Sequence, residues 1–167
     1  RHLRRAGENV LLMCQGIALS QCEIPESLIE RYELSERIIR RGEGDIEFRF
    51  LLAERLPVLP LWHEGQFLIL SWGNRDRHNK LPVSAWCSQE SLEAGAWHHL
   101  RPREVFIPAS FAWDRGVWYQ VREGLKGVVV TDCERKQPVY VLTQPATHYY
   151  EVMTRNNREP VMVGETI

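Results

Sequence analysis

Short apolar runs separated by proline and glycine dominate the chain after Gly44, and this pattern most constrains the fold. Such runs are typical of β-strands joined by turns. Hairpin turns are expected at Glu64-Gly65 and at Asp114-Arg115-Gly116. The pattern predicts six strands, at Leu56–Trp62, Gln66–Trp72, Glu104–Pro108, Val117–Arg122, Gly127–Cys133 and Pro138–Thr143.

Helical patterns are fewer. Pro25 opens a predicted helix that runs to about Ile39, because proline suits the first helical turn and apolar residues recur among charged ones. Gly42 and Gly44 should prevent the helix from extending further. A second short helix is predicted at Gln89–His99, with Ser88 or Ser91 near its N-terminus.

Two polar stretches, Asn74–Lys80 and Gln144–Arg158, are predicted to be loops or short helices. Neither a repeat nor a linker rich in proline or serine divides the chain. We therefore expect one α+β domain over residues 1–167, with a mostly antiparallel, barrel-like sheet and a few helices.

Composition narrows the function classes. With 167 residues, 44% of them hydrophobic, the chain can close one core without disulfides or metals. A net charge of −1 provides no global attraction to nucleic acid, so a nucleic-acid role needs a local basic groove. The four cysteines form no Cys-x-x-Cys pair, which argues against a zinc ribbon or a thioredoxin-like motif, and we expect a reducing compartment. No apolar run approaches the roughly 20 residues of a membrane span, so we expect a cytoplasmic protein without a membrane partner.

The chemical reactivity expected of Cys14, which follows Met13, depends on where the natural chain starts. If Met13 is the start and is removed, Cys14 carries an α-amine and a thiol, with ordinary pKa values of about 8 and 8.5. Such an aminothiol condenses with aldehydes into a ring. An internal cysteine in an apolar stretch is instead a small buried hydrophobe. We expect Arg1–Leu12, which is rich in arginine, to be a leader or an extension outside the fold.

Several familiar chemistries are excluded by residue order. The sequence has no Gly-x-x-x-x-Gly-Lys phosphate loop, no Gly-x-Ser-x-Gly elbow and no His-Glu-x-x-His zinc helix. The neighbours His98 and His99 would point about 100° apart on a helix, which is unsuited to one metal. No metal or cofactor is expected.

Aromatic and arginine side chains are concentrated between Trp72 and Tyr119. Exposed rings can stack on unpaired bases while arginines bind phosphates, which is how proteins hold single-stranded DNA. In a domain this small, most of these rings should fill the core, leaving one or two at a surface groove. With one arginine from the C-terminal region, the predicted DNA contacts are Trp72, Arg75, Arg77, Trp86, Trp113 and Arg158.

Read in order, these pieces resemble the SOS-response-associated peptidase (SRAP) family, whose members begin Met-Cys-Gly-Arg-Phe-Ala-Leu before a helix. The shared order covers about Met13 to Val163. The segments that carry it are Met13-Cys14-Gln15-Gly16-Ile17-Ala18-Leu19, Leu56-Pro57-Val58-Leu59, Leu70-Ser71-Trp72-Gly73, Gln89-Glu90-Ser91, Val105-Phe106-Ile107-Pro108-Ala109, Val117-Trp118-Tyr119-Gln120-Val121, Leu142-Thr143 and Arg158-Glu159-Pro160-Val161-Met162-Val163.

The resemblance implies a DNA-damage-response protein that binds single-stranded DNA and attaches itself covalently to abasic sites. In that chemistry the N-terminal cysteine closes a thiazolidine ring on the sugar aldehyde, after the protein has processed its own N-terminus. Carried over by position, Cys14 is the nucleophile and Asp114 stands where the family has its catalytic Glu. Glu90 is a supporting carboxylate, and Asn156 takes the position of the family's His.

This sequence departs from the family at positions around the cysteine. Asn156 cannot shuttle a proton near pH 7 as a His can. Trp86 stands at the active-site Asn, and Gly16 replaces the Arg of the opening motif. Two other interpretations therefore stay open. The fold is retained as a binding or interaction module, or Cys14 or Cys87 works with His148 as a cysteine hydrolase.

Overall fold

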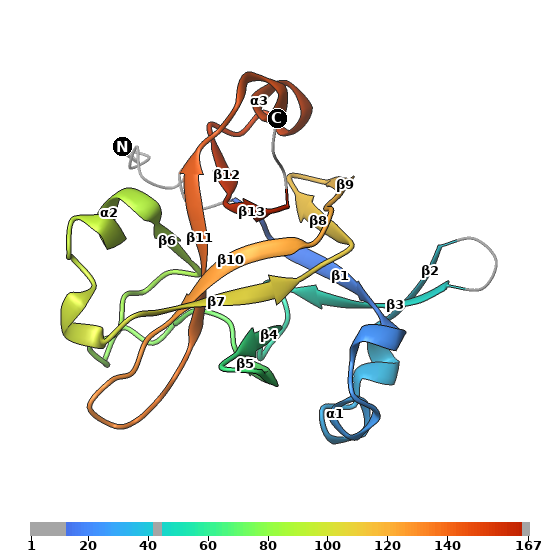
Figure 1. Cartoon of the computed structure of the whole chain (residues 1–167), viewed down its shortest axis with the longest axis horizontal. Coiled ribbons are helices and arrows are strands. Elements are labelled where there is room, and N and C mark those ends of the chain that lie inside the picture. The colour runs from blue at the N-terminus through green and yellow to red at the C-terminus, as the bar shows by residue number, and fades with distance from the viewer. Residues whose placement is uncertain (1–12, 42–44, 165–167) are drawn as a thin grey trace, which may run out of the picture.

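Two mostly antiparallel β-sheets form the body of the fold in the computed structural model of the chain (Figure 1). The structure describes residues 13–41 and 45–164, and within them it contains three α-helices. The α+β class and the mainly antiparallel pairing predicted from the sequence are confirmed. Arg1–Leu12, predicted to be a leader or extension, lies outside the described residues, as do Gly42 and Gly44.

The first sheet holds five strands in the order β2-β3-β1-β8-β9. Its middle strand, β1, begins two residues after Cys14 and pairs antiparallel with β3 on one side and β8 on the other. In sheet order, the strands are Ile38–Arg41 (β2), Asp45–Leu51 (β3), Gly16–Ser20 (β1), Phe111–Asp114 (β8) and Val117–Gln120 (β9).

The second sheet holds eight strands, six of them in the order β12-β11-β10-β7-β4-β5. In addition, β13 pairs with β10, and β6 pairs parallel with β11. The strands are Arg158–Pro160 (β12), Val139–Pro145 (β11), Gly124–Val129 (β10), Arg103–Pro108 (β7), Val58–His63 (β4), Gln66–Ser71 (β5), Met162–Val163 (β13) and Trp86–Ser88 (β6).

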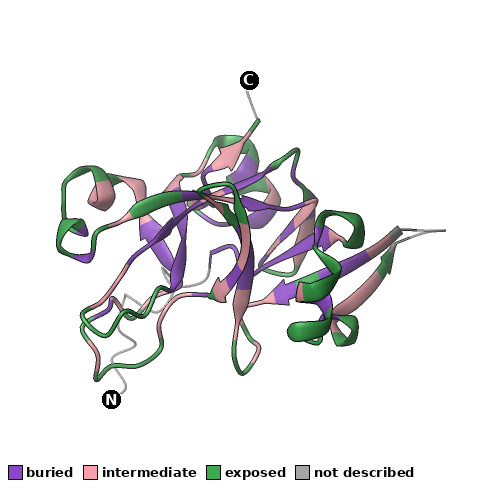
Figure 2. Cartoon of the chain, turned by 60° about the horizontal axis from the view of Figure 1, so that its bottom comes forward, coloured by how far each residue is buried: buried purple, intermediate pink, exposed green. Residues whose placement is uncertain are grey.

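Neither sheet closes on itself within the described strands, because each pairing order ends in two different edge strands. The expected barrel-like curvature therefore does not lead to a closed barrel. One apolar cluster nevertheless joins the sheets, since it contains Ile17 and Phe48 from the first and Leu59, Ile107 and Leu125 from the second. Figure 2 shows the buried residues concentrated on the strands. Burial of each such side chain contributes about 1.5–3 kcal/mol.

The N-terminal helix is shorter than predicted. α1 spans Glu26–Arg31, and Glu33 then adopts a left-handed backbone with φ 52° that ends the helix. A 3₁₀ turn, η3 (Leu34–Arg37), leads directly into β2. The prediction of a helix to Ile39 is wrong because Ile38 and Ile39 are β-branched and pair with β3.

The other helices flank the sheets. α2 (Gln89–Glu93) starts as predicted, with the Ser88 side chain accepting a hydrogen bond from the Ser91 backbone N–H. It ends before Gly95 instead of reaching His99, because Gly95 takes φ 83°. α3 (His148–Thr154) lies in the second predicted polar stretch. Two further 3₁₀ turns are η2 (Gln21–Glu23) and η4 (His98–Leu100).

Both predicted hairpin turns are present. Glu64 and Gly65 connect β4 to β5 with φ values of 50° and 76°, and Arg115 and Gly116 connect β8 to β9 with 47° and 82°. Positive φ at both central residues matches the twist of paired strands. In the part of the chain that the structure describes, no helix has the length and apolar character needed to cross a membrane.

Candidate functional site

Cys14 lies in the extended segment before β1 and is fully buried. Its thiol faces the Gly16 carbonyl oxygen at 3.6 Å. The next residue fixes the segment on both sides, because the Gln15 N–H donates to the Trp113 carbonyl and the Gln15 carbonyl accepts from the Leu52 N–H, each at 2.8 Å. Cys14 is therefore held at the junction of β8 and the end of β3.

Asp114, the last residue of β8, is also fully buried. The Tyr150 hydroxyl donates to its Oδ2 at 2.6 Å. The Asn156 side-chain amide lies 3.3 and 3.4 Å from the two carboxyl oxygens. Both donors come from the C-terminal part of the chain, so tertiary packing supplies the partners of this carboxyl group.

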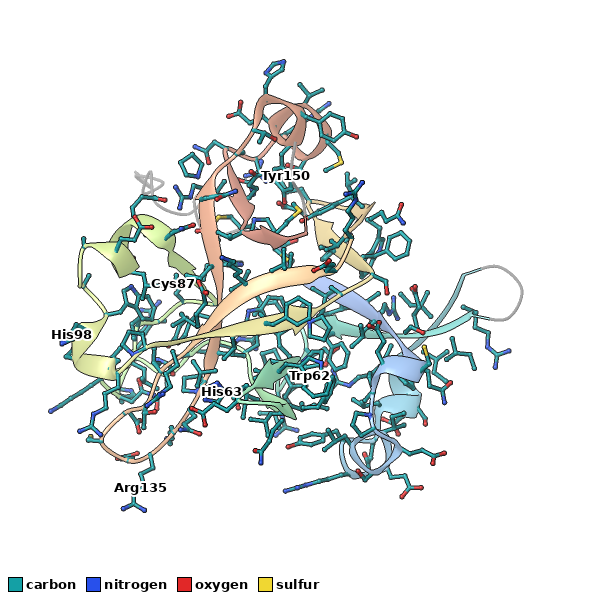
Figure 3. The ribbon with its side chains drawn as sticks, in the orientation of Figure 1. Trp62, His63, Cys87, His98, Arg135 and Tyr150 are labelled. Atoms are coloured by element: carbon teal, nitrogen blue, oxygen red, sulfur yellow. The ribbon has the colours of Figure 1, made fainter. Side chains whose placement is uncertain are left out.

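A second tyrosine extends the polar group. The hydroxyls of Tyr119 and Tyr150 are 3.2 Å apart, and their rings meet edge to face with centroids 5.5 Å apart. We call Cys14, Asp114, Tyr119, Tyr150 and Asn156 together the Asp114 cluster. Figure 3 shows Tyr150 pointing inward beneath α3.

Burial controls the protonation of this cluster. It raises the pKa of Asp114 above its ordinary 3.8, although the hydrogen bonds from Tyr150 and Asn156 and the charge of Arg115 act in the opposite direction. Burial also raises the pKa of the Cys14 thiol to about 12, with a smaller contribution from the Asp114 charge. An internal Cys14 is therefore a neutral thiol near pH 7, whereas Asp114 keeps its proton to higher pH than an exposed aspartate.

Local sequence features set where α3 begins and ends, and so place Tyr150 and Asn156 next to Asp114. The Thr147 side chain caps the helix by accepting from the Tyr150 N–H at 3.2 Å. Arg155 then takes a left-handed φ of 60° that ends the helix and directs Asn156 inward. The Arg115 guanidinium donates to the Arg155 carbonyl at 3.2 Å, which ties the β8–β9 turn to the helix end.

Trp86 and Trp113, both predicted to contact DNA, flank the Cys14 segment. The Trp86 indole N–H donates to the Cys14 carbonyl at 2.9 Å, and its side chain is mostly buried. Trp113 is half-buried and lies 6.2 Å from the Trp118 ring. Trp113 therefore offers more ring surface for stacking, while Trp86 holds the backbone of the cysteine.

Trp72 is placed in the core. It is only 2% exposed, and its indole N–H donates to the Ala85 carbonyl at 3.1 Å. A ring this deeply buried has no free face for a base. Of the three predicted tryptophans, Trp72 is the most deeply buried, followed by Trp86 at 8% exposed and the half-buried Trp113.

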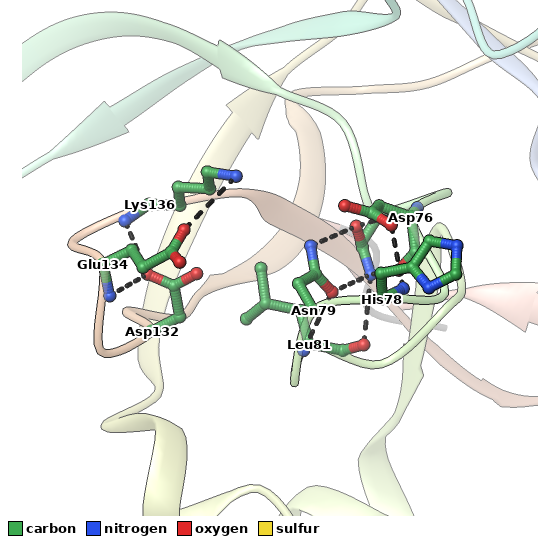
Figure 4. A network of polar contacts seen from close by, with 8 residues as sticks. Asp76, His78, Asn79, Leu81, Asp132, Glu134 and Lys136 are labelled. Carbon is green, nitrogen blue, oxygen red and sulfur yellow. Dashed lines mark hydrogen bonds and ion pairs between the residues drawn. The ribbon is translucent and has the colours of Figure 1, made fainter.

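Arg75 and Arg77 belong to a loop braced by side-chain amides, and Figure 4 shows the Asn79 amide in this loop. In this loop the amide groups of Asn74 and Asn79 bond to each other at 2.9 and 3.0 Å. Arg75 donates to the carbonyl of Leu52, whose N–H binds Gln15, so it lies two hydrogen bonds from the Cys14 segment. Arg77 is exposed.

Glu90 and Arg158 form a surface ion pair at 2.8 Å. The Arg158 guanidinium lowers the pKa of Glu90 from its ordinary value of 4.5. Arg158 also reaches the Thr143 hydroxyl at 3.2 Å. The link to the Asp114 cluster is through the backbone, since the Arg158 N–H donates to the Asn156 side-chain oxygen at 3.3 Å.

The glycine at position 16 has a steric reason in this fold. A Cβ added to Gly16 would lie 2.7 Å from the Leu51 side chain and 3.3 Å from the Phe50 carbonyl oxygen. The arginine of the family motif therefore does not fit here without a shift of Leu51.

Tyr119 and Tyr150 were not predicted as site residues, and His148 was considered only in the cysteine hydrolase interpretation. His148 is exposed on α3. Across residues 13–41 and 45–164, no hydrogen bond joins His148 to Cys14 or Cys87, and burial raises the pKa of Cys87 to about 11. This arrangement gives no support to the cysteine hydrolase interpretation. No signal in the sequence pointed to Tyr150, because the Thr147 cap binds only the backbone N–H of this residue.

Comparisons with protein-family models, with curated proteins and with solved structures found no match to this chain.

Proposed function

We propose that this protein captures the aldehyde of abasic sites in single-stranded DNA through Cys14, once Cys14 is the N-terminal residue. The proposal joins the resemblance to the SRAP family with one observation. Cys14 and the buried Asp114 belong to a single cluster, although 100 residues separate them in sequence. An acid-base group beside the aminothiol is the arrangement that this reaction needs.

The chemistry proceeds in two additions. The α-amine of Cys14 attacks the aldehyde carbon, and the resulting carbinolamine loses its hydroxyl as water to give an imine. The thiol sulfur then adds to the imine carbon, its proton passes to the nitrogen, and a thiazolidine forms. One water is released overall. Asp114 protonates the departing hydroxyl and recovers a proton from the nitrogen as the imine forms, a role suited to a carboxyl with a raised pKa.

Tyr150 and Asn156 position this carboxyl. Tyr150 donates to Oδ2, and the Asn156 amide reaches both oxygens, so the carboxyl plane is held from two directions. Asn156 moves no proton in this scheme. It acts as a fixed donor where the SRAP family has a titratable His.

Single-stranded DNA would reach the cluster past Trp113, Arg75 and Arg158. Trp113 supplies a half-buried ring beside Gln15, and Arg75 is bonded to the same neighbourhood. Arg158 lies two residues from Asn156 and binds Glu90, which a phosphate can replace as its partner.

A second candidate function rests on the burial of Cys14. With Met13 attached, Cys14 is fully buried, Met13 is 7% exposed, and the pKa of the thiol is about 12. An inert thiol in this position fits a fold that is retained as a binding or interaction module. The two candidates differ in one property, which is whether a terminal Cys14 forms a covalent adduct.

The test expresses the chain from Met13 and verifies by intact mass that Cys14 is the first residue. This protein is mixed with a single-stranded oligonucleotide that carries one abasic site. We expect a denaturation-resistant adduct whose mass is the sum of the two molecules minus one water. Cys14→Ala should abolish it, and Cys22→Ala, which changes an exposed cysteine, should leave it intact.

An adduct that persists in Cys14→Ala would disprove capture through this residue. No adduct from a protein that begins at Cys14, together with retained binding to intact single strands, would favour the module. Asp114→Asn should slow adduct formation by about 10²-fold or more, the usual contribution of a general acid or base. An unchanged rate would remove Asp114 from the mechanism.

A further inference from the structure

A groove remote from the Asp114 cluster lies where the β4–β5 hairpin leaves the second sheet. β4 pairs with β7 at one register position, Trp62 with Phe106, whereas β7 pairs with β10 along six. Beyond Trp62 the hairpin diverges and leaves a hollow of about 430 Å³. In Figure 3 the labelled residues Trp62 and His63 lie well apart from Tyr150.

The floor of this groove, which we call the Trp62 groove, is apolar. Trp62 is 42% exposed, and Phe67 holds its ring edge to face with centroids 5.2 Å apart. Phe106 packs directly over Gly124, because a Cβ there would lie 2.7 Å from the Phe106 ring. Val105 and Val163 complete the apolar lining. A large aromatic side chain that stays exposed beside a hollow is typical of a binding surface.

The charge of the lining is negative. Glu64, Glu104 and Glu123 face one cation, Lys126, whose ammonium lies 3.9 Å from Glu104. Glu64 pairs with Arg103 at the outer edge, at 3.4 Å. Glu123 has no cationic partner anywhere in the described ranges. The groove therefore combines aromatic faces with a carboxylate that has no counter-ion among the described residues.

We propose that the Trp62 groove binds an arginine or lysine side chain presented by a basic segment of a partner protein. The aliphatic stem would lie on Trp62 and Phe106, and the charged head would reach Glu123 and Glu104. Aromatic faces attract such cations, and long cationic side chains pack their methylenes on apolar surface. This proposal goes beyond aldehyde capture and does not depend on it, since no residue of the Asp114 cluster lines the groove.

The experiment follows the Trp62 indole N–H signal by NMR, assigned with Trp62→Phe, during titration with two pentapeptides. One is acetyl-Gly-Arg-Gly-Arg-Gly-amide, and the other has Glu in place of both Arg residues. We expect the arginine peptide alone to shift the Trp62 signal, with saturation. Raising the salt concentration should weaken this binding, because exposed charges are screened.

Variants test the two halves of the groove. Trp62→Ala should weaken the arginine peptide about fivefold, followed through the backbone signals of Val105 and Lys126. Glu123→Gln should weaken it about threefold, as expected for one exposed charge pair. The matched controls are Leu56→Ala and Glu134→Gln, which change an exposed apolar and an exposed acidic residue outside the groove and should leave the affinity unchanged.

Three results would overturn the proposal. One is an equal response to both peptides, and another is a titration that leaves the Trp62 signal unmoved. The third is a concentration-dependent dimer in sedimentation experiments that Trp62→Ala dissociates, because the occupant would then be a second copy of the chain.

Discussion

The Asp114 cluster and the surface pair of Glu90 and Arg158 hold their carboxylates in opposite ways. Asp114 is fully buried, and this burial raises its pKa although Tyr150 and Asn156 donate hydrogen bonds to it. Glu90 is largely exposed and meets a guanidinium, which lowers its pKa. The two regions are joined by the short segment from Asn156 to Arg158.

Because of this difference in burial and partners, the Asp114 carboxyl is suited to proton transfer, whereas the Glu90 carboxylate is suited to pairing with a cation. A buried carboxyl with neutral donors changes protonation at higher pH and responds strongly to the loss of a partner. An exposed ion pair is screened by solvent and contributes little to stability. Asp114 therefore fits an acid-base role, and Glu90 fits the placement of Arg158.

The largest expected effect is the difference between Asp114→Ala and Glu90→Ala in how far each lowers the free energy of unfolding. Asp114→Ala removes the carboxyl to which the buried Tyr150 hydroxyl and Asn156 amide donate, and should lower the free energy of unfolding by about 3 kcal/mol. Glu90→Ala should cost below about 1 kcal/mol. Urea denaturation of both variants measures this contrast. Equal losses would remove the distinction between the two regions.

A smaller effect is expected from Tyr150→Phe. The change deletes one hydroxyl that donates to Asp114 and should cost about 2 kcal/mol, as for hydrogen bonds to charged groups. It should also raise the pKa of Asp114 further, because a donor to the charged form is lost. Carboxyl carbon NMR follows this titration, and urea denaturation gives the stability.

The matched control for that variant is Tyr149→Phe. Tyr149 is the neighbouring residue on α3 and is 76% exposed, so its hydroxyl is already solvated. Its loss should change stability by less than about 0.5 kcal/mol. Similar losses in both variants would mean that the contact between Tyr150 and Asp114 contributes nothing specific.

The smallest effect is a pair of pH dependences with opposite sign. A carboxyl whose pKa is raised on folding loses stability as pH rises above its unfolded value, so the advantage of wild type over Asp114→Asn should shrink above pH 3.8. Glu90 has a lowered pKa and contributes above pH 4.5, so the advantage over Glu90→Gln should shrink as pH falls below that value. Urea denaturation from pH 3 to 7 measures both, and slopes of the same sign would contradict the assignment.

The sequence predicted strand positions correctly where apolar runs are bounded by turns. β4, β5, β7 and β11 lie within about two residues of their predicted limits, because proline and glycine mark their ends. β3 was missed although Ile46, Phe48 and Phe50 alternate with polar residues, which is the period of a strand. β8 was also missed, although the predicted turn at Asp114-Arg115-Gly116 and the predicted strand after it imply a partner strand before the turn.

The α+β class, both hairpin turns and a serine near the start of α2 could be predicted from the sequence, because these features depend on neighbours within a few residues. Tertiary packing places Trp72 in the core and brings Trp86 to the Cys14 carbonyl and Tyr150 to Asp114. These partners are 36 or more residues apart, except for the local bond of Trp72. The order of strands across a sheet brings such residues together, and the spacing of residues along the chain does not predict that order.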